Sequence, residues 1–288
     1  MSEPSEFELA LYVVATPLGN LGDITRRAMA VFAQVPVIAC EDTRVTRDLL
    51  RLLAIPAPVL LSVREHNEHA AADSVIARLA AGEAVAYASD AGTPAISDPG
   101  GRLVATVREA GFAIIPVPGV SAVTAALSVA GLESTAFTFV GFAPVTASSL
   151  AQFIERIAVR VETTVFFESP HRVDKTLQAL AAGLPADCRV LIARELTKKF
   201  ETIVALAAGE IDTWRVTNAE RLRGEFVIVV AGAASAPTQM FVDAQKLLKT
   251  LLEELPPAKA ATFSAVFVRR QTFASAHSPP RPDRKSVV

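Results

Sequence analysis

The stretch AVAYASDAGTPAISDPG, residues 84–100, decides the fold class. It opens with a short β-prone run, Ala84–Ser89, passes through a loop with glycines and prolines, and enters a helical pattern near Pro99. The same unit of strand, polar loop and helix recurs through the first part of the chain. Such alternation is typical of an α/β fold in which helices cover a largely parallel sheet.

Working outward from this unit, similar runs predict the other strands and helices of an N-terminal domain, residues 9–117. The further strands are expected at 10–15, 36–40, 58–62 and 113–117, with helices beginning near Asp23, Thr43 and Glu68. The stiff segment Pro116–Gly119 marks the expected domain boundary, and a helical pattern follows it at Val120–Ala130.

The second part of the chain has a different pattern, which predicts a C-terminal domain over residues 118–233. Strands are expected at 137–141, 163–168, 189–193, 202–207 and 225–231. Because crossover helices become scarce toward the end, we expect a mixed sheet with an antiparallel final portion. Residues 234–288 are expected to form a linker, a helix at Gln239–Leu255 and a disordered tail whose basic residues could form a contact arm.

Composition narrows the class of protein. Of the 288 residues, 51% are hydrophobic and 20% charged, which excludes a mainly disordered chain. The formal net charge of −2 gives no global basic field, so any RNA contact must depend on a local patch. Cys40 and Cys188 stand alone, without disulfide or zinc spacing, and no metal is expected.

The sequence also bears on localisation. The acidic, polar start of the chain lacks a secretion pattern, and the uncharged stretch Ala110–Leu132 is interrupted by Pro116, Pro118 and Gly119. We therefore expect a cytoplasmic protein with no membrane partner.

Unusual residues follow the first four predicted strands, where ligands gather in open α/β sheets. In the loop after the fourth strand, Gly92 and Gly100 permit close backbone approach, and Thr93 and Ser97 offer hydroxyl groups for a small polar ligand. Residue types alone equally allow a structural turn before a helix.

The other strand ends leave alternatives open. Arg44 could grip a phosphate while Glu41 or Asp42 accepts a proton, or Asp42 could simply cap the next helix. His66 and His69 lack a third metal ligand, so a polar cluster at a helix start is preferred. The sequence contains no GxSxG or GxxxxGK[ST] motif, and no GxGxxG follows the first strand, which weakens ordinary hydrolase and nucleotide-binding interpretations.

Eight short motifs, taken together, resemble the tetrapyrrole methylase superfamily, in its branch of rRNA ribose methyltransferases. They cover residues 9–232 in order: Val14–Thr25, Glu41–Arg44, His66–Glu68, Ser89–Pro94, Pro118–Ala122, Glu168–Arg172, Arg194–Lys198 and Gly224–Phe226. The resemblance implies a two-domain fold with S-adenosylmethionine in the cleft between the domains. It also implies 2′-O-methylation of a cytidine in the decoding region of 16S rRNA, within the small ribosomal subunit.

Carried over by position, the resemblance implies cofactor contacts at Pro17, Asp90, Ala91, Gly92, Thr93, Ala95, Ile96, Ser121, Ala122, Phe167, Leu196 and Thr197. The candidate proton acceptors are Glu41, Asp42 and Glu68, since a ribose hydroxyl is a poor nucleophile that needs a nearby base. The candidate RNA contacts are Arg44, His66, Asn67, His171 and Arg172.

The resemblance leaves other functions in view. Relatives with this fold could methylate a tetrapyrrole or diphthine, and a homologue could bind cofactor or RNA without turnover. A homodimer is possible, although an ordinary core explains the apolar residues 120–130 equally well. The segment Thr262–Val288 does not resemble the family's C-terminal helical module, and Val145–Leu150 lacks the basic residues usual in the family there.

Overall fold

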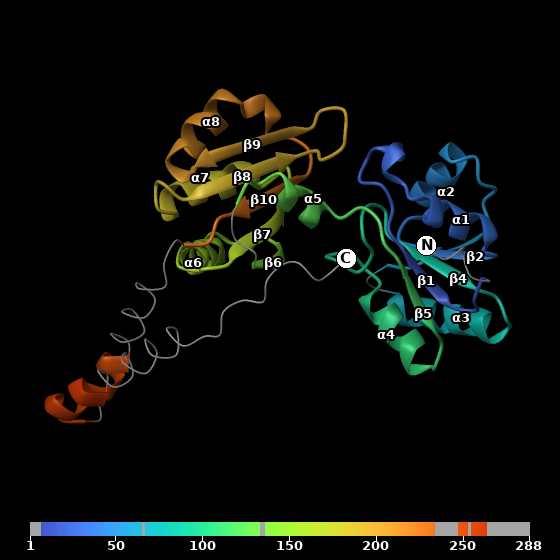
Figure 1. Ribbon diagram of the computed structural model, residues 1–288, viewed down its shortest axis with the longest axis horizontal. Helices are drawn as coiled ribbons and strands as arrows, with labels where there is room; N and C mark the ends of the chain where they lie inside the picture. The colour runs from blue at the N-terminus through green and yellow to red at the C-terminus, as the bar shows by residue number, and fades with distance from the viewer. Residues whose placement is uncertain (1–6, 65–66, 133–135, 234–246, 253–254, 264–288) are drawn as a thin grey trace, which may run out of the picture.

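The computed structural model describes residues 7–64, 67–132, 136–233, 247–252 and 255–263. Two five-stranded sheets follow one another along the chain and lie in separate lobes, joined by the segment between β5 and α5 (Figure 1). This arrangement confirms the expected α/β class, with one parallel and one mixed sheet.

The N-terminal sheet has the order β3-β2-β4-β1-β5, and every pairing in it is parallel. Its strands are β1 (Leu11–Val14), β2 (Val37–Cys40), β3 (Val59–Ser62), β4 (Val85–Ala88) and β5 (Ile114–Val117). In register, Val14 lies opposite Val117 and Cys40 opposite Ala88, so the carboxyl ends of the strands share one edge.

Helices cover both faces of this sheet because the buried strands are apolar on both sides. Phe32 of α1 (Arg26–Gln34) and Leu50 of α2 (Thr43–Leu52) pack in one cluster with Ile38. On the other face, α3 (Glu68–Ala80) and α4 (Gly101–Glu109) pack in a second cluster with Val37. Figure 1 shows these helix pairs on opposite sides of the sheet.

The C-terminal sheet has the order β6-β7-β10-β8-β9. Its strands are β6 (Phe137–Phe142), β7 (Thr163–Glu168), β8 (Arg189–Arg194), β9 (Thr202–Ala207) and β10 (Phe226–Val230). The β6–β7 pair is parallel, and the pairs around β10 and β9 are antiparallel. Strand β10 is buried along its whole length in the middle of the sheet.

Helices α6 (Ala147–Ala158), α7 (Val173–Gly183) and α8 (Ile211–Thr217) pack on one face of this sheet, and α5 (Ala122–Ser128) on the other. Short 3-10 helices lie at Leu21–Asp23, Ala208–Glu210 and Ala219–Arg221, and residues 247–252 and 257–263 are also helical. Side chains of Thr25, Asp42 and Thr146 accept backbone N–H groups and so cap α1, α2 and α6.

The expected strands are all present, and the mixed character of the second sheet is confirmed. Residues 247–252 of the helix expected at Gln239–Leu255 are helical, while the linker and residues 264–288 of the tail lie outside the described residues. Within the described ranges, no helix has the length and apolar content that crossing a membrane requires.

Candidate functional site

Three loops at the carboxyl edge of the N-terminal sheet are joined by hydrogen bonds. After β1 and β4, Thr16 and Gly92 each donate a backbone N–H to the carbonyl oxygen of the other, at 2.9 and 3.0 Å. The Thr93 hydroxyl donates to the carbonyl of Val120, 2.9 Å away, just after β5. Gly92 has a φ of +78°, a conformation that glycine adopts without steric cost. These bonds fix the loops as one surface.

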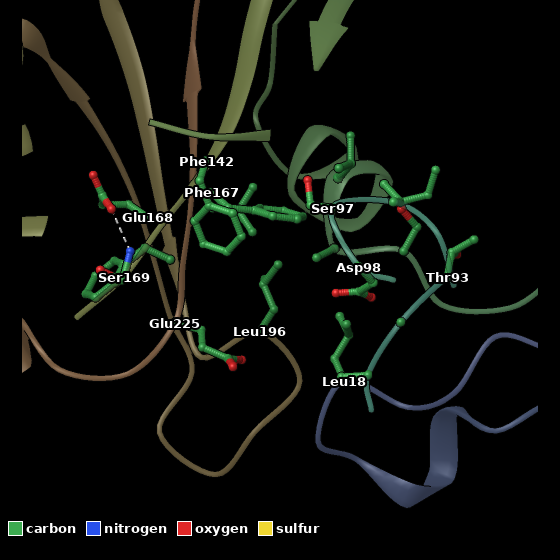
Figure 2. A pocket seen from close by; sticks show the side chains of 18 of the residues that line it. Leu18, Thr93, Ser97, Asp98, Phe142, Phe167, Glu168, Ser169, Leu196 and Glu225 are labelled. Carbon is green, nitrogen blue, oxygen red and sulfur yellow. Dashed lines mark hydrogen bonds between the residues drawn. The ribbon is translucent and has the colours of Figure 1, made fainter. Parts of the chain in front are cut away.

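A cavity of about 320 Å³ lies between this surface and the C-terminal sheet (Figure 2). The loops of the first half contribute Leu18, Ala91, Gly92, Thr93, Ile96, Ser97 and Asp98, and the residues after β5 contribute Ser121, Ala122 and Val123. The second half contributes Phe142, Phe167, Glu168, Ser169, Pro170, Leu196, Lys198, Glu225, Phe226 and Val227.

The wall formed by the C-terminal sheet is largely aromatic and aliphatic. The Phe167 ring packs edge-on against Phe139 and Phe142, with centroid separations of 4.9 and 5.6 Å. Leu196 and Val227 complete this wall. Figure 2 shows Phe142 and Phe167 together on the side of the cavity that faces the loop of Thr93 and Asp98. A flat apolar ligand such as a purine ring fits a wall of this kind.

Glu168 is the last residue of β7 in this wall, and both oxygens of its carboxylate have partners on neighbouring residues. Its carboxylate lies 2.7 Å from the Arg172 guanidinium and accepts the Ser169 N–H and the Thr176 hydroxyl, at 2.7 and 2.6 Å. Arg172 also donates to the Ala143 carbonyl at 3.1 Å. The pair therefore holds β6, β7 and α7 together.

Carboxylates of the first half lie in a less satisfied environment. Burial, followed by the negative charge of Glu41, raises the pKa of Asp98 to about 6, although a hydrogen bond from Ser89 acts in the opposite direction. Burial is also the main cause that raises the pKa of Glu41 and of Asp90. This edge of the sheet thus holds three carboxyl groups with increased proton affinity.

Two glycines allow the halves to touch beside the cavity. A Cβ at Gly19 would lie 2.4 Å from Cγ of Lys198, so only glycine admits this lysine as it stands. A Cβ at Gly141 would lie 3.3 Å from the Ser97 hydroxyl oxygen. Lys198 Nζ is itself held by Glu195 and Glu225, at 3.0 and 2.9 Å.

Most of the predicted cofactor residues come together at the cavity. Those that line it are Ala91, Gly92, Thr93, Ile96, Ser121, Ala122, Phe167 and Leu196. Pro17, Asp90, Ala95 and Thr197 are adjacent in sequence to lining residues but do not line it themselves. The Asp90 carboxylate instead accepts the Asp42 N–H at 3.0 Å, and the buried Thr197 hydroxyl has no hydrogen-bond partner among the described residues.

The three predicted proton acceptors lie at the same sheet edge but do not line the cavity. Asp42 caps α2 and pairs with Arg44 at 2.6 Å, which lowers the pKa of its carboxyl group. Glu41 accepts the Asp90 N–H at 3.4 Å. Glu68 is buried and accepts the Gly100 N–H at 2.9 Å, while its other oxygen has no partner in the described part of the chain.

The predicted RNA residues divide into exposed and structural groups. Arg44 has 79% of its side chain exposed, and His171 is exposed. Asn67 accepts the Arg64 N–H and donates to the Ser62 carbonyl, which orders the turn before α3. Arg172 is occupied by Glu168, as described above, and His66 lies outside the described residues.

Sequence reasoning did not single out Asp98, Lys198 or Glu225, which line the cavity. Asp98 stands in the quoted loop, but only Thr93, Ser97 and backbone amides of that loop were considered as groups that bind a ligand. Its position in the loop that follows a parallel strand is the signal that could have identified it. Lys198 and Glu225 are in recognised motifs, and their pairing across 27 residues has no local signature.

Comparison with known proteins identifies the fold family. A family model described as Tetrapyrrole (Corrin/Porphyrin) Methylases matches residues 10–212. The chain belongs to this family. Within the tetrapyrrole methylases, a protein named ribosomal RNA small subunit methyltransferase I from Neisseria meningitidis serogroup B is 45% identical over 256 residues, covering 88% of this chain and 87% of the relative. Its namesake in Escherichia coli O157:H7 is 42% identical over 255 residues, covering 88% and 89%.

Solved structures share the fold of this chain. A conserved hypothetical protein from Aeropyrum pernix K1 matches with a TM-score of 0.60 at 18% identity, covering 94% of this chain and 99% of that one. Uroporphyrin-III C-methyltransferase from Thermus thermophilus, complexed with S-adenosyl homocysteine, matches with a TM-score of 0.51 at 19% identity, covering 77% and 97%. The expected fold and the expected methyltransferase class are both confirmed. In the described ranges, no group of three or more His, Cys, Asp or Glu residues could hold a metal ion.

Proposed function

We propose that this methyltransferase transfers a methyl group from S-adenosylmethionine to the ribose 2′-oxygen of a cytidine in the decoding region of 16S rRNA, in the small ribosomal subunit. The observation that carries the proposal is the cavity, because eight residues expected at the cofactor site line it together. The relatives' shared name, ribosomal RNA small subunit methyltransferase I, supports the choice of substrate. A cytoplasmic location follows from this substrate.

The residues present fit the cofactor. Phe167 and Leu196 offer an apolar wall for the adenine, and the loop Ala91–Thr93 brings backbone groups to the opposite side for the methionine end. When bound, S-adenosylmethionine supplies an electrophilic methyl group on a sulfonium. The neighbour with bound S-adenosyl homocysteine shares the fold, which supports the same class of ligand.

We assign the RNA contact to the exposed charges beside the cavity. Arg44 extends into solvent from the start of α2, at the same sheet edge as the loop of Asp90. Phosphate contacts of this kind set the register of a nucleic acid on a protein, whereas contacts to the bases determine which nucleotide is recognised. We also propose residues 9–117 and 118–233 as two domains, one for each sheet. The possible homodimer stays a prediction.

The first test is transfer of labelled methyl from S-adenosylmethionine to small ribosomal subunits that lack this modification. We expect incorporation at a ribose 2′-oxygen. Incorporation into a tetrapyrrole but not into rRNA would replace the proposed substrate. If neither substrate accepts a methyl group although the cofactor and the ribosomal subunits both bind, the chain is a binding protein rather than an enzyme.

A set of variants tests the division between cofactor and RNA contacts. Asp90→Ala and Thr93→Ala should weaken cofactor binding about tenfold, because each removes a bond that orders the loops around the cavity. Arg44→Ala should leave cofactor affinity unchanged and reduce rRNA methylation. Calorimetric titration with S-adenosylmethionine measures the first effect, and the initial rate on ribosomal subunits measures the second. The reverse pattern would contradict the division.

A further inference from the structure

Three carboxylates line the cavity: Asp98, Glu168 and Glu225. Two of them form ion pairs: Glu168 with Arg172 at 2.7 Å and Glu225 with Lys198 at 2.9 Å. No Lys or Arg in the described ranges forms an ion pair with Asp98. Asp98 is therefore the cavity carboxylate whose proton affinity is not suppressed by a paired cation.

The position of Asp98 is set by the backbone around it. Ser97 has a φ of +65°, unusual for a residue with a side chain, and Tyr87 donates its hydroxyl to the carbonyl of Pro99 on the other side. Figure 2 shows the Asp98 carboxylate directed into the space between the loop of Thr93 and the opposite side, where Leu196 and Glu225 lie. A strained loop that aims a polar group into a cavity is typical of functional sites.

We propose that Asp98 is a catalytic residue that accepts the proton of the attacking hydroxyl group. The inference deepens the proposed function and rests on it. In the step, the hydroxyl oxygen forms a bond to the methyl carbon as the carbon–sulfur bond breaks. Sulfur keeps the electron pair of that bond, and the hydroxyl proton passes to the Asp98 carboxylate. Charge balances, because a sulfonium and a carboxylate become a neutral thioether and a neutral carboxylic acid.

The earlier candidates are less well placed for this role. The Asp42 carboxylate caps the N-terminus of α2 and forms an ion pair with Arg44, and the Glu68 carboxylate accepts the backbone N–H of Gly100. Glu41 lies behind the Asp90 backbone and does not line the cavity. A general base must come within hydrogen-bond reach of the proton it takes, so a group in the cavity wall has the advantage.

The electrostatic surroundings suit a base. Burial is the main cause of the raised pKa of Asp98, and Glu41, Asp90 and Glu225 add negative charge from the second strand end, the same loop and the opposite wall. Lys198 also lines the cavity, but its ammonium is paired with Glu195 and Glu225. A carboxylate with a pKa near 6 accepts a proton more readily than an ordinary one and is still ionised at neutral pH.

The test compares the full-length protein with Asp98→Asn, which keeps the size of the side chain and removes its basicity. The matched control is Asp73→Asn, at an exposed position on α3 away from the cavity. With saturating S-adenosylmethionine and small subunits, we expect the single-turnover rate of Asp98→Asn to fall by about 100-fold or more, the usual scale for loss of a general base. The control should keep the wild-type rate.

Two readouts do not depend on turnover. Calorimetry should show that Asp98→Asn binds S-adenosylmethionine within about threefold of wild type, since the proposed role is toward the hydroxyl proton. Carbon NMR of protein labelled at the aspartate carboxyl carbons, without cofactor, should show one resonance that titrates near pH 6 in wild type and is missing from Asp98→Asn. The wild-type rate should decrease below the same pH.

The outcomes are distinct. A wild-type rate on rRNA with an equal rate for Asp98→Asn would overturn the Asp98 proposal and leave the proposed function intact. An affinity loss for S-adenosylmethionine that matches the rate loss would also overturn it, because Asp98 would then hold the cofactor. Wild-type protein that methylates no RNA hydroxyl would overturn both proposals together. A large rate loss with retained affinity and the missing NMR titration would support the role.

Discussion

The two halves of the molecule treat the carboxylates beside the cavity in opposite ways. In the C-terminal half, Glu168 is buried and receives an arginine, a hydroxyl and a backbone N–H. In the N-terminal half, Asp98 and its neighbours Glu41 and Asp90 are partly buried and have raised pKa values. The comparison teaches that the second half forms a fixed platform of paired charges. The loops of the first half instead hold carboxylates whose charged form is disfavoured by burial.

The largest expected effect tests the platform. Arg172→Ala leaves the Glu168 carboxylate buried without its cation, and removing one partner of such a pair costs about 3–5 kcal/mol of unfolding free energy. Urea unfolding of the purified proteins measures this loss. The control Arg44→Ala removes an exposed ion pair and should cost less than about 1 kcal/mol. Equal losses in the two variants would show that the platform description is wrong.

The second prediction tests the strain in the first half. The folded protein raises the pKa of Asp98 from 3.8 to about 6, so between these values the folded state binds more protons than the unfolded state. Stability therefore falls as pH rises through this window, and the full cost, up to about 3 kcal/mol, is present at higher pH.

Asp98→Asn removes that cost, so it should be more stable than wild type near about pH 8 and equal to it below about pH 4. Urea unfolding at the two pH values gives the difference. Such a gain would mean that the wild-type residue is retained at the expense of stability, as functional residues often are. A stability difference that does not change with pH would contradict the electrostatic cause.

The smallest expected effect concerns the backbone of the loops. Gly92 and Gly82 both have φ near +80°, but a Cβ at Gly92 would lie 3.2 Å from the Leu18 side chain, whereas nothing lies within 4 Å of a Cβ at Gly82. Each change to alanine should cost about 1 kcal/mol of stability. Gly92→Ala should also reduce the affinity for S-adenosylmethionine about tenfold, or about 1.4 kcal/mol, and Gly82→Ala should not. Calorimetric titration separates the two, and equal affinities would show that the Gly92 contact is unimportant.

Sequence reasoning located the strands because local patterning determines them. The runs around Val37 and Val85 are short, apolar and bounded by turn residues, and each forms a buried strand. The antiparallel portion of the second sheet could also be predicted, because the sequence shows few crossover helices between its later strands.

The details of the site depend on contacts that sequence does not display. Asp42 was one of three equal candidates until its helix cap and its pairing with Arg44 were known. A role for Asp98 could be inferred only from the structure, which shows the positive φ of Ser97 and the wall of the second half that encloses the cavity. Arg172 was a candidate for RNA, although its spacing of four residues from Glu168 at a strand end was a signal for an internal ion pair.

The central place of β10 in its sheet has a consequence for synthesis of the protein. Among the described residues β10 is the last strand in sequence, yet it lies between β7 and β8 and bears Phe226 and Val227 on the cavity wall. A nascent chain therefore carries β7 and β8 with unpaired edges until this segment leaves the ribosome, and unpaired strand edges invite aggregation. Truncation before Phe226 should abolish the second lobe as a whole, because β7 and β8 would both lose the strand that lies between them.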